Sequence, residues 1–253
     1  MPISQVAFIE KMVNSSSLED LWHLHLDKMQ SFGFAGALYG YTNFRYEDNL
    51  GDPEDFVILS NHDRNYLDQF FGKRMFAKAP MVQWTLHNDG VCSWSVVREK
   101  IAKNEYSREE LEILEFNRSW GISTGYTISF KSLSPRSKGG IGLTGGPDST
   151  QADIEAIWQE HGSQILLLNN IFHLKVQQLP YRYPQRALTD RQREVLEWVS
   201  DGKTSQDIAM LIGRTTATVE KHLRLAREAL GVQTTAQAVS KATFLNQIFL
   251  YEG

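Results

Sequence analysis

The sequence predicts an α/β protein of two domains: an N-terminal sandwich of helices around a sheet, and a C-terminal all-α domain of four helices that contains a helix-turn-helix. Three observations predict this class. The 253 residues suffice for two domains with a sizeable core. Before residue 179, helical patterns alternate with short apolar runs that are typical of strands. From residue 188 on, helical segments begin at threonines, and the first three end at glycines.

The N-terminal elements follow from hydrophobic periodicity and from residues that start or end helices. Residues 15–17 are serines that can cap a helix ended by Gly33, and Ser107 with Glu110 is typical of a capping box. Asp148 or Ser149 is expected to cap the longest helix, whose broad apolar side suits a dimer contact or burial within its own domain. The expected helices are 2–13, 18–32, 61–72, one starting within 75–84, one after Ser107, and 151–178; the expected strands are 34–41, 56–59, 121–130 and 141–144, with a strand-like turn at 91–94.

The C-terminal helices each have a start signal. These signals are Thr189 with Gln192, Thr204 with Asp207, Thr216, and Thr234 or Thr235. Gly202, Gly213 and Gly231 end the first three helices. Two short helices joined by a tight turn with a glycine are typical of a helix-turn-helix, so we expect one around Gly213.

The third of these helices has one apolar and one polar side. Its apolar residues recur at steps of four, three and four and therefore share one face: Val219, Leu223, Ala226 and Leu230. The other side carries small, basic and hydrogen-bonding residues that can enter a major groove: Ala217, Glu220, Lys221, Arg224 and Arg227. Residues at the helix N-terminus can hold a phosphate: Arg214, Thr215 and Thr216. A charged face can also be merely solvated, but caps, turn and apolar side together favour DNA binding.

Several short motifs in this region resemble one family. They are Leu188–Thr189, Arg193–Glu194–Val195–Leu196, Gly202–Lys203–Thr204, Ile208–Ala209, and Thr218–Val219 followed by His222. Together they resemble the helix-turn-helix output domain of LuxR-type transcription regulators. The motif set is specific to that output domain and leaves open what the preceding domain senses.

The net charge is −4, but its distribution matters more than its sum. Residues 186–253 carry nine Lys and Arg against eight Asp and Glu, which gives +1 and leaves −5 for the rest of the chain. A single weakly basic domain should bind DNA modestly, because phosphate contacts dominate affinity. A dimer would double those contacts.

The single cysteine, Cys92, excludes an intramolecular disulfide and is expected to be a small core residue. With no secretion signal at the N-terminus, this indicates a reducing, cytoplasmic compartment. The sequence has no apolar run of 18 residues, so neither a membrane span nor a membrane partner is expected.

Neither catalytic residues, nor a metal site, nor a cofactor is predicted. The histidines are scattered, and no serine lies in the sequence context of a nucleophile. Residues 140–145 spell Gly-Ile-Gly-Leu-Thr-Gly, but dinucleotide-binding glycines belong at a strand-to-helix turn with an acidic residue about twenty positions later. We interpret these glycines as small residues that let another group approach a sheet.

The aromatic residues of the N-terminal half resemble the autoinducer-binding domain of LuxR-type quorum sensors. The resemblance rests on the spacing of Tyr66, Phe70, Pro80 and Trp94, and on residues 120–125, which end at Gly125. With the output domain it covers nearly the whole chain. It implies an α/β/α sandwich with a pocket for an acyl-homoserine lactone, a homodimer, and an inverted-repeat promoter site. In the alternative interpretation these aromatic residues are simply core.

The chain departs from the family pattern at three pocket positions. Tyr66 stands where most members have a tryptophan that binds the lactone carbonyl, and its hydroxyl can still donate. Phe70 replaces a tyrosine, and Ala79 replaces the aspartate that accepts the ligand amide N–H. Loss of a hydrogen bond to a charged group costs about 1.5–3 kcal/mol, roughly ten- to a hundredfold in affinity. Either another acceptor replaces it, with Thr144 and His62 as candidates, or the ligand has no amide there, or no ligand is required.

The sequence therefore predicts a ligand-responsive transcription regulator with a sensing and dimerisation domain at 1–176, a linker at 177–187 and a DNA-binding domain at 188–253. The expected partners are double-stranded DNA, a second copy of the chain and a small amphiphilic signal, with RNA polymerase as a further candidate. The predicted ligand-binding residues are Tyr66, Phe70, Ala79, Pro80, Trp94, Gly125, Thr144 and His62. One alternative is a regulator that folds without ligand or senses a non-lactone signal. Another is a hydrolase of signal lactones.

Overall fold

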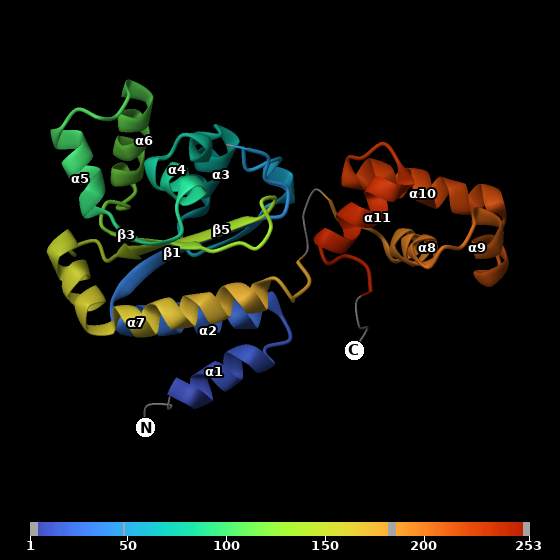
Figure 1. The fold of residues 1–253 in the computed structure, drawn as a ribbon, viewed down its shortest axis with the longest axis horizontal. Coiled ribbons are helices and arrows are strands. Elements are labelled where there is room, and N and C mark those ends of the chain that lie inside the picture. The colour runs from blue at the N-terminus through green and yellow to red at the C-terminus, as the bar shows by residue number, and fades with distance from the viewer. Residues whose placement is uncertain (1–4, 48, 182–185, 250–253) are drawn as a thin grey trace. The chain divides into compact units, whose positions relative to one another are not determined.

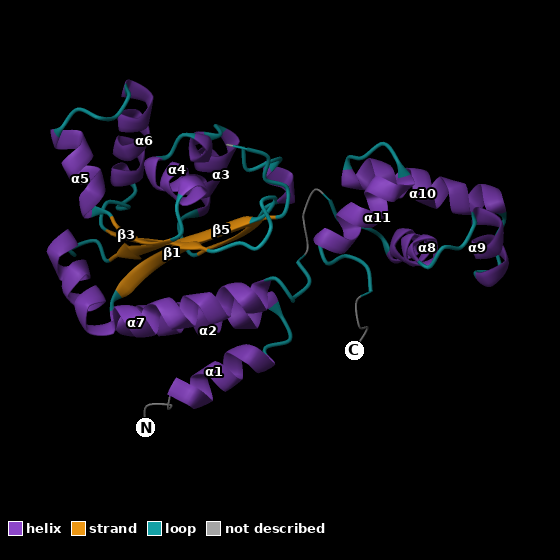
Figure 2. Cartoon of the chain, viewed as in Figure 1, coloured by secondary structure: helices purple, strands orange, loops and turns teal. Residues whose placement is uncertain are grey.

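A computed structural model of the chain describes residues 5–47, 49–181 and 186–249 (Figures 1 and 2). The chain forms two compact units, Met1–Gln177 and Gln178–Gly253. Residues 182–185 of the predicted linker and residues 2–4 of the first predicted helix lie outside the described residues. Within the described residues, we find no helix that combines the length and the apolar character needed to cross a membrane.

The first unit is built on a five-stranded antiparallel sheet. Its strand order is β2-β1-β5-β4-β3, with β1 at Phe34–Thr42, β2 at Val57–Ser60, β3 at Gly90–Ser93, β4 at Gly125–Phe130 and β5 at Lys138–Gly145. Figure 1 shows α2 (Leu18–Phe32) and α7 (Gln151–Val176) on one face of the sheet, with α1 (Gln5–Asn14) beyond them. On the other face lie α3 (Arg64–Gly72), α4 (Pro80–His87), α5 (Ser95–Ala102) and α6 (Arg108–Ser119). The predicted α/β/α sandwich is therefore confirmed.

The face of the sheet toward α2 and α7 forms the main core. Successive side chains of a strand point to opposite faces, and on this face they are large. Tyr126 stacks on Trp158 of α7 at 4.2 Å between ring centroids, and Phe130 stacks on His173 at 4.1 Å. The largest fully buried side chains of these strands are Phe34, Tyr39, Ile128, Phe130, Ile141 and Leu143.

Two histidines lie inside this core as neutral, hydrogen-bonded groups. His25 Nε2 is 3.1 Å from Asn169 Oδ1, and His173 Nδ1 is 2.8 Å from the Tyr39 hydroxyl. Burial disfavours the charged imidazolium. It lowers the pKa of His25 to about 4, and burial together with the nearby charge of Lys138 lowers the pKa of His173 to about 3.

Helix starts in the first unit agree with the sequence for α2 and α6, and several others differ in start or cap. Helix α3 begins at Arg64 and not at Asn61, because Asp63 caps it, and α5 is not among the predicted helices. Ser17 caps α2, and Ser107 forms a capping box with Glu110 as predicted. Helix α7 is capped by Thr150 with Asp153, and not by Asp148 or Ser149, because Thr150 closes the reciprocal pair of hydrogen bonds. The helix expected within 75–84 is divided into a 3₁₀ turn, Met75–Ala77, and α4, since Pro80 starts a new helix. A further 3₁₀ turn at Pro53–Asp55 lies in a predicted loop.

The second unit consists of α8 (Asp190–Ser200), α9 (Ser205–Leu211), α10 (Thr216–Leu230) and α11 (Thr235–Phe244). Thr189, Thr204 and Thr234 form capping boxes. The cap of α10 is Thr215, one residue before the predicted Thr216, because the Thr215 hydroxyl accepts from the Thr218 N–H. The core contains Leu188, Val195, Leu196, Ile208, Val219, Leu223, Ala226, Leu230, Ala238 and Ala242. The predicted four-helix arrangement is confirmed.

We expect the first unit to lose stability on mild acidification. An unfolded histidine binds a proton below pH about 6.5, whereas the folded protein leaves His25 neutral down to its lowered pKa. The contribution of neutral His25 to the free energy of unfolding is therefore complete above pH 6.5. It declines as the pH falls toward 4, by up to roughly 1.4 kcal/mol per pH unit. Urea unfolding between pH 7 and 5 measures this slope. His25→Gln, which keeps an amide near Asn169 but cannot titrate, should show a smaller slope. If the wild type and His25→Gln lost stability equally with falling pH, His25 would not be the titrating group.

Candidate functional site

A cavity of about 890 Å³ lies in the first unit, on the face of the sheet opposite α7. Its walls come from the sheet and from α3 to α6. Apolar side chains dominate the lining, and this volume falls within the range of pockets that hold drug-sized ligands, about 300–1,000 Å³. Seven of the eight predicted ligand-binding residues line it: His62, Tyr66, Phe70, Ala79, Pro80, Trp94 and Thr144.

The sheet leaves this space open because its cavity side carries small residues. Gly140 and Gly142 alternate with the large Ile141 and Leu143, so both glycines face the cavity. Their cross-strand partners on β1 and β4 include Gly40 and Thr127, which also line it. A Cβ at Gly142 would be 3.5 Å from the Trp94 ring, and a Cβ at Gly140 only 2.8 Å from Thr85. These glycines lie within an antiparallel strand, so the literal dinucleotide pattern at 140–145 has no strand-to-helix turn.

Gly125 is the predicted residue that the cavity does not include. It lies at the start of β4, where an added Cβ would be 2.2 Å from the carbonyl oxygen of Leu143 and 3.1 Å from the Trp94 ring. Its small size therefore allows Trp94 to lie close against the strand. Trp94 in turn donates from Nε1 to Thr127 Oγ1 at 2.8 Å.

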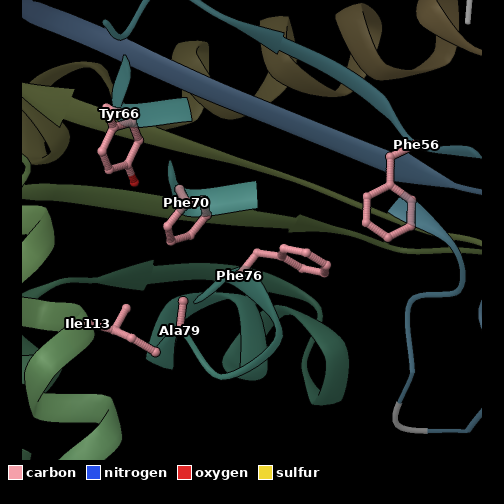
Figure 3. Close-up of a cluster of buried hydrophobic side chains, with 6 residues drawn as sticks. All are labelled: Phe56, Tyr66, Phe70, Phe76, Ala79 and Ile113. Carbon is pink, nitrogen blue, oxygen red and sulfur yellow. The ribbon is translucent and has the colours of Figure 1, made fainter. Parts of the chain in front are cut away.

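The wall opposite the sheet is a buried cluster of Phe56, Tyr66, Phe70, Phe76, Ala79 and Ile113 (Figure 3). Tyr66 stacks on Phe70 at 5.3 Å and on Phe116 of α6 at 5.5 Å. Ala79 is 3% exposed and stands immediately before α4, without a side chain that can cap it. At this position the cavity has a methyl group where a carboxylate would offer a hydrogen-bond acceptor.

Four polar residues of the lining contact one another in a row that includes Tyr66. Thr144 Oγ1 is 3.5 Å from His62 Nε2, the His62 ring meets the Tyr66 ring edge-on at 5.7 Å, and the Tyr66 hydroxyl donates to Asn117 Oδ1 at 3.1 Å. Burial lowers the pKa of His62 and raises the pKa of Tyr66, so both are neutral at pH 7. The row can therefore exchange neutral hydrogen bonds with a ligand.

Sequence reasoning missed Asn117 and Thr127. Both line the cavity, and each accepts a hydrogen bond from an aromatic residue of the predicted set. Asn117 lies 51 residues from Tyr66 in the sequence. Its place on α6 carries no periodic signal, because polar residues are common on an amphipathic helix.

The residues of α5 and α6 that line the cavity are only partly covered by other side chains. Helix α5 has no buried residue, and α6 buries only Ile113. Val97, Ile101, Leu111 and Leu114 nevertheless line the cavity, and Ile101 and Leu111 are more than 40% exposed. Apolar side chains at an opening can cover an apolar ligand that enters there.

In the second unit, α10 presents the two sides that its sequence predicts. Val219, Leu223, Ala226 and Leu230 are buried. Arg214, Thr215, Thr216, Ala217, Glu220, Lys221 and Arg224 are exposed. A helix held by one apolar side and open on the other can place its polar side chains against base edges.

Local contacts hold several of these polar side chains in place. Glu220 accepts a hydrogen bond from Ser205 of α9, which ties the two helices of the motif together. Arg224 pairs with Glu228 one turn later. Arg227 differs from the others because it is half-buried and donates to Thr235 of α11 at 3.0 Å. Its part in contacting DNA stays a prediction.

Within the described ranges, no group of three or more His, Cys, Asp or Glu side chains could hold a metal ion. Cys92 is buried, and burial raises the pKa of its thiol.

Comparisons with known proteins agree with both units. Residues 17–176 match the family model of the autoinducer binding domain, and residues 186–242 match that of bacterial regulatory proteins of the luxR family. The chain is 23% identical over 231 residues to transcriptional activator protein AnoR of Acinetobacter nosocomialis, which covers 90% of this chain and 91% of AnoR.

Two solved structures share the fold. SdiA of Escherichia coli superposes with a TM-score of 0.55 at 17% identity, covering 97% of this chain and 98% of SdiA. SdiA in complex with octanoyl-rac-glycerol gives 0.52 at 15% identity, covering 99% of this chain and all of that one. At such identities the likeness extends to the fold alone.

We expect Gly142→Val to reduce the cavity without unfolding the unit. The added methyl groups extend from a strand position that already faces the cavity, and a Cβ there meets Trp94 at an ordinary contact distance. Binding of the apolar fluorophore N-phenyl-1-naphthylamine should weaken about tenfold, the loss that roughly 1.4 kcal/mol of apolar contact produces. Gly72→Val, at the end of α3 where a Cβ meets nothing within 4 Å, is the matched control. Equal fluorophore binding by both variants would contradict the cavity assignment.

Proposed function

Because the chain belongs to the LuxR family of bacterial regulatory proteins, with an autoinducer-binding domain before its helix-turn-helix, we propose that it is a transcription regulator controlled by a small amphiphile. The cavity binds the ligand, and α10 reads the major groove as part of a homodimer on an inverted-repeat promoter site. One observation supports this most directly. A large, mainly apolar cavity and a helix with an exposed polar face occur in the same chain.

The proposed ligand is an acyl-homoserine lactone or a close relative. The cavity has room for an acyl chain between the glycine-rich face of the sheet and the buried cluster, while Tyr66, His62 and Thr144 can bind a polar head. A ligand that binds only the folded protein stabilises it by RT ln(1 + [L]/Kd), about 2.7 kcal/mol at a hundredfold excess over Kd. Ligand binding would thus complete the core of the first unit.

The proposed dimer explains how a weakly basic DNA-binding unit can act on a promoter. Two copies double the number of phosphate contacts. They also place two recognition helices about one DNA turn apart, roughly 34 Å, which matches an inverted repeat. The ligand-filled unit would stabilise this dimer. Relatives such as AnoR are named transcriptional activators, which supports activation as the output, with RNA polymerase as a candidate partner.

The second candidate is a regulator that folds without ligand or answers a non-lactone amphiphile. Ala79 favours it, because an amide N–H of the ligand would find no carboxylate there. The SdiA complex with octanoyl-rac-glycerol supports the idea that this fold can hold an acyl ester. In neither candidate do we propose a cofactor or a catalysed reaction. Appearance of hydrolysis product on incubation with a lactone would instead support a hydrolase.

Thermal unfolding with and without ligands tests the proposal. The full chain is purified and heated with acyl-homoserine lactones of short and long chains, and separately with octanoyl glycerol. An increase of several degrees with lactones supports the first candidate. An increase with octanoyl glycerol alone, or a high melting temperature that no lactone changes, supports the second.

Ala79→Asp should tighten lactone binding by about ten- to a hundredfold, because the carboxylate supplies an acceptor for the amide N–H. The same change should lower the stability of the empty protein, since a buried carboxylate without a partner is costly. Titration calorimetry and thermal unfolding measure the two effects. Weaker lactone binding by the variant would show that Ala79 does not face the ligand's amide.

Arg224→Ala should weaken DNA binding by about 1–3 kcal/mol and relax the preference at one base pair. The mutation breaks only an exposed ion pair with Glu228, so folding should change little. Arg108→Ala is the matched control, because Arg108 forms the same kind of exposed pair with Glu112 in the first unit. Fluorescence anisotropy with selected promoter DNA gives both affinities. Unchanged affinity in Arg224→Ala would show that another face of α10 meets the DNA.

A further inference from the structure

We propose that Asn117 recognises the ligand's head group, by donating a hydrogen bond from its side-chain amide to a carbonyl oxygen, and that Tyr66 positions that amide. The inference rests on the proposed function, because it assigns one contact within the same cavity. The cavity would then select ligands that have an acyl carbonyl, whether this carbonyl belongs to an amide or to an ester.

The hydrogen bonds of Asn117 leave its donor free for a ligand. A side-chain amide has one carbonyl oxygen and two N–H donors. Here Oδ1 accepts from the Tyr66 hydroxyl at 3.1 Å, while Nδ2 makes no hydrogen bond within residues 5–47, 49–181 and 186–249. Asn117 lines the cavity. Its N–H groups are therefore the part of the side-chain amide that other side chains leave available for a ligand.

The position of Asn117 is fixed from two directions. Its backbone carbonyl accepts from the N–H groups of Trp120 and Ile122 at 3.1 and 2.9 Å, which anchors the end of α6. Its side chain is held by Tyr66, whose ring is packed between Phe70 and Phe116 and is 2% exposed. Burial raises the pKa of Tyr66, so the hydroxyl stays protonated and can donate its hydrogen bond to Asn117. A donor held this firmly loses little entropy when a ligand binds.

The surroundings of this donor favour a carbonyl over an N–H group. The methyl of Ala79 offers no acceptor in the buried cluster. The candidate replacement acceptors, Thr144 Oγ1 and His62 Nε2, lie 3.5 Å apart and already contact each other. The acidic residue of the lining, Glu115, is three-quarters exposed and lies 3.9 Å from Arg118. Ligand binding should therefore depend on a carbonyl oxygen and depend little on an amide N–H.

Two ligands that differ in one atom test this inference. Octanoyl-homoserine lactone has an amide N–H, and its oxygen isostere, α-octanoyloxy-γ-butyrolactone, has an ester oxygen in that place but the same carbonyls. Both are titrated at pH 8 against the full-length wild type and the variants Asn117→Asp and Asn117→Leu. Asn117→Asp keeps an acceptor for Tyr66 and replaces the donor by a carboxylate. Asn170→Asp, on the exposed side of α7, is the matched control.

Wild type and Asn170→Asp should bind the two ligands within about threefold of each other. Asn117→Leu should weaken both by roughly tenfold, and Asn117→Asp should prefer the amide by at least about tenfold, because only the amide can donate to a carboxylate. Melting temperatures without ligand show whether each variant folds. A merely structural role of Asn117 would not change the ratio between ligands.

Three results would overturn the inference. If folded Asn117→Asp and Asn117→Leu bind both ligands as the wild type does, Asn117 makes no ligand contact while the proposed function stands. If the wild type prefers the amide by more than about tenfold, the cavity holds another acceptor for the N–H, and selection for a carbonyl alone fails. If the wild type binds no amphiphile at all, the proposed function fails and this inference fails with it.

Discussion

The difference between the two faces of the sheet is the constraint on which the rest of the first unit depends. Toward α2 and α7 the strands present Tyr39, Phe130, Ile141 and similar side chains, which are completely buried. Toward α3 to α6 the central strands present glycines and small polar residues, while Leu38 and Ile58 of β1 and β2 pack against the buried cluster. Because strand side chains alternate, one strand such as β5 can fill one core and leave the other open. The cavity is thus built into the strand sequence and does not result from loose packing of the helices.

An open cavity changes how the covering helices are held. Interiors of proteins are normally close-packed, and each void removes contacts from its walls. Here the wall facing the sheet is held by ring-to-ring contacts. Phe56 contacts Phe76, and Tyr66 contacts Phe70 within the same buried cluster. Helix α5, which also lines the cavity, contains no aromatic residue that could join these contacts and has no buried residue. The stability of this layer is therefore the part of the fold that an occupant of the cavity would increase most.

The sequence predicts what depends on local chemistry and misses what depends on distant contacts. Capping boxes, glycines that end helices and the apolar residues of α10 at steps of four, three and four are visible in short segments, and the structure confirms them. Helix α5 escapes prediction because it has neither a capping side chain nor a buried stripe. Thr150 could not be chosen over Ser149, since either hydroxyl can cap a helix. Asn117 and Thr127 become visible only when folding brings them to Tyr66 and Trp94.

The absence of a carboxylate at position 79 also affects the protein without ligand. A buried carboxylate is tolerable only when it is paired, so an acidic residue at position 79 would make the empty cavity costly and the fold more dependent on its ligand. Ala79 removes that cost, and the polar groups beside Tyr66, which are His62, Thr144 and Asn117, are uncharged and partly satisfy one another. The charged residues of the lining are either exposed, as Arg98, Glu115 and Arg118 are, or paired, as Lys138 is with Asp89 at 2.7 Å. An apolar ligand would still gain free energy by filling the cavity volume. If the cavity holds a ligand as we propose, the empty unit would carry no unpaired carboxylate at position 79, and the ligand would add stability mainly by filling apolar volume.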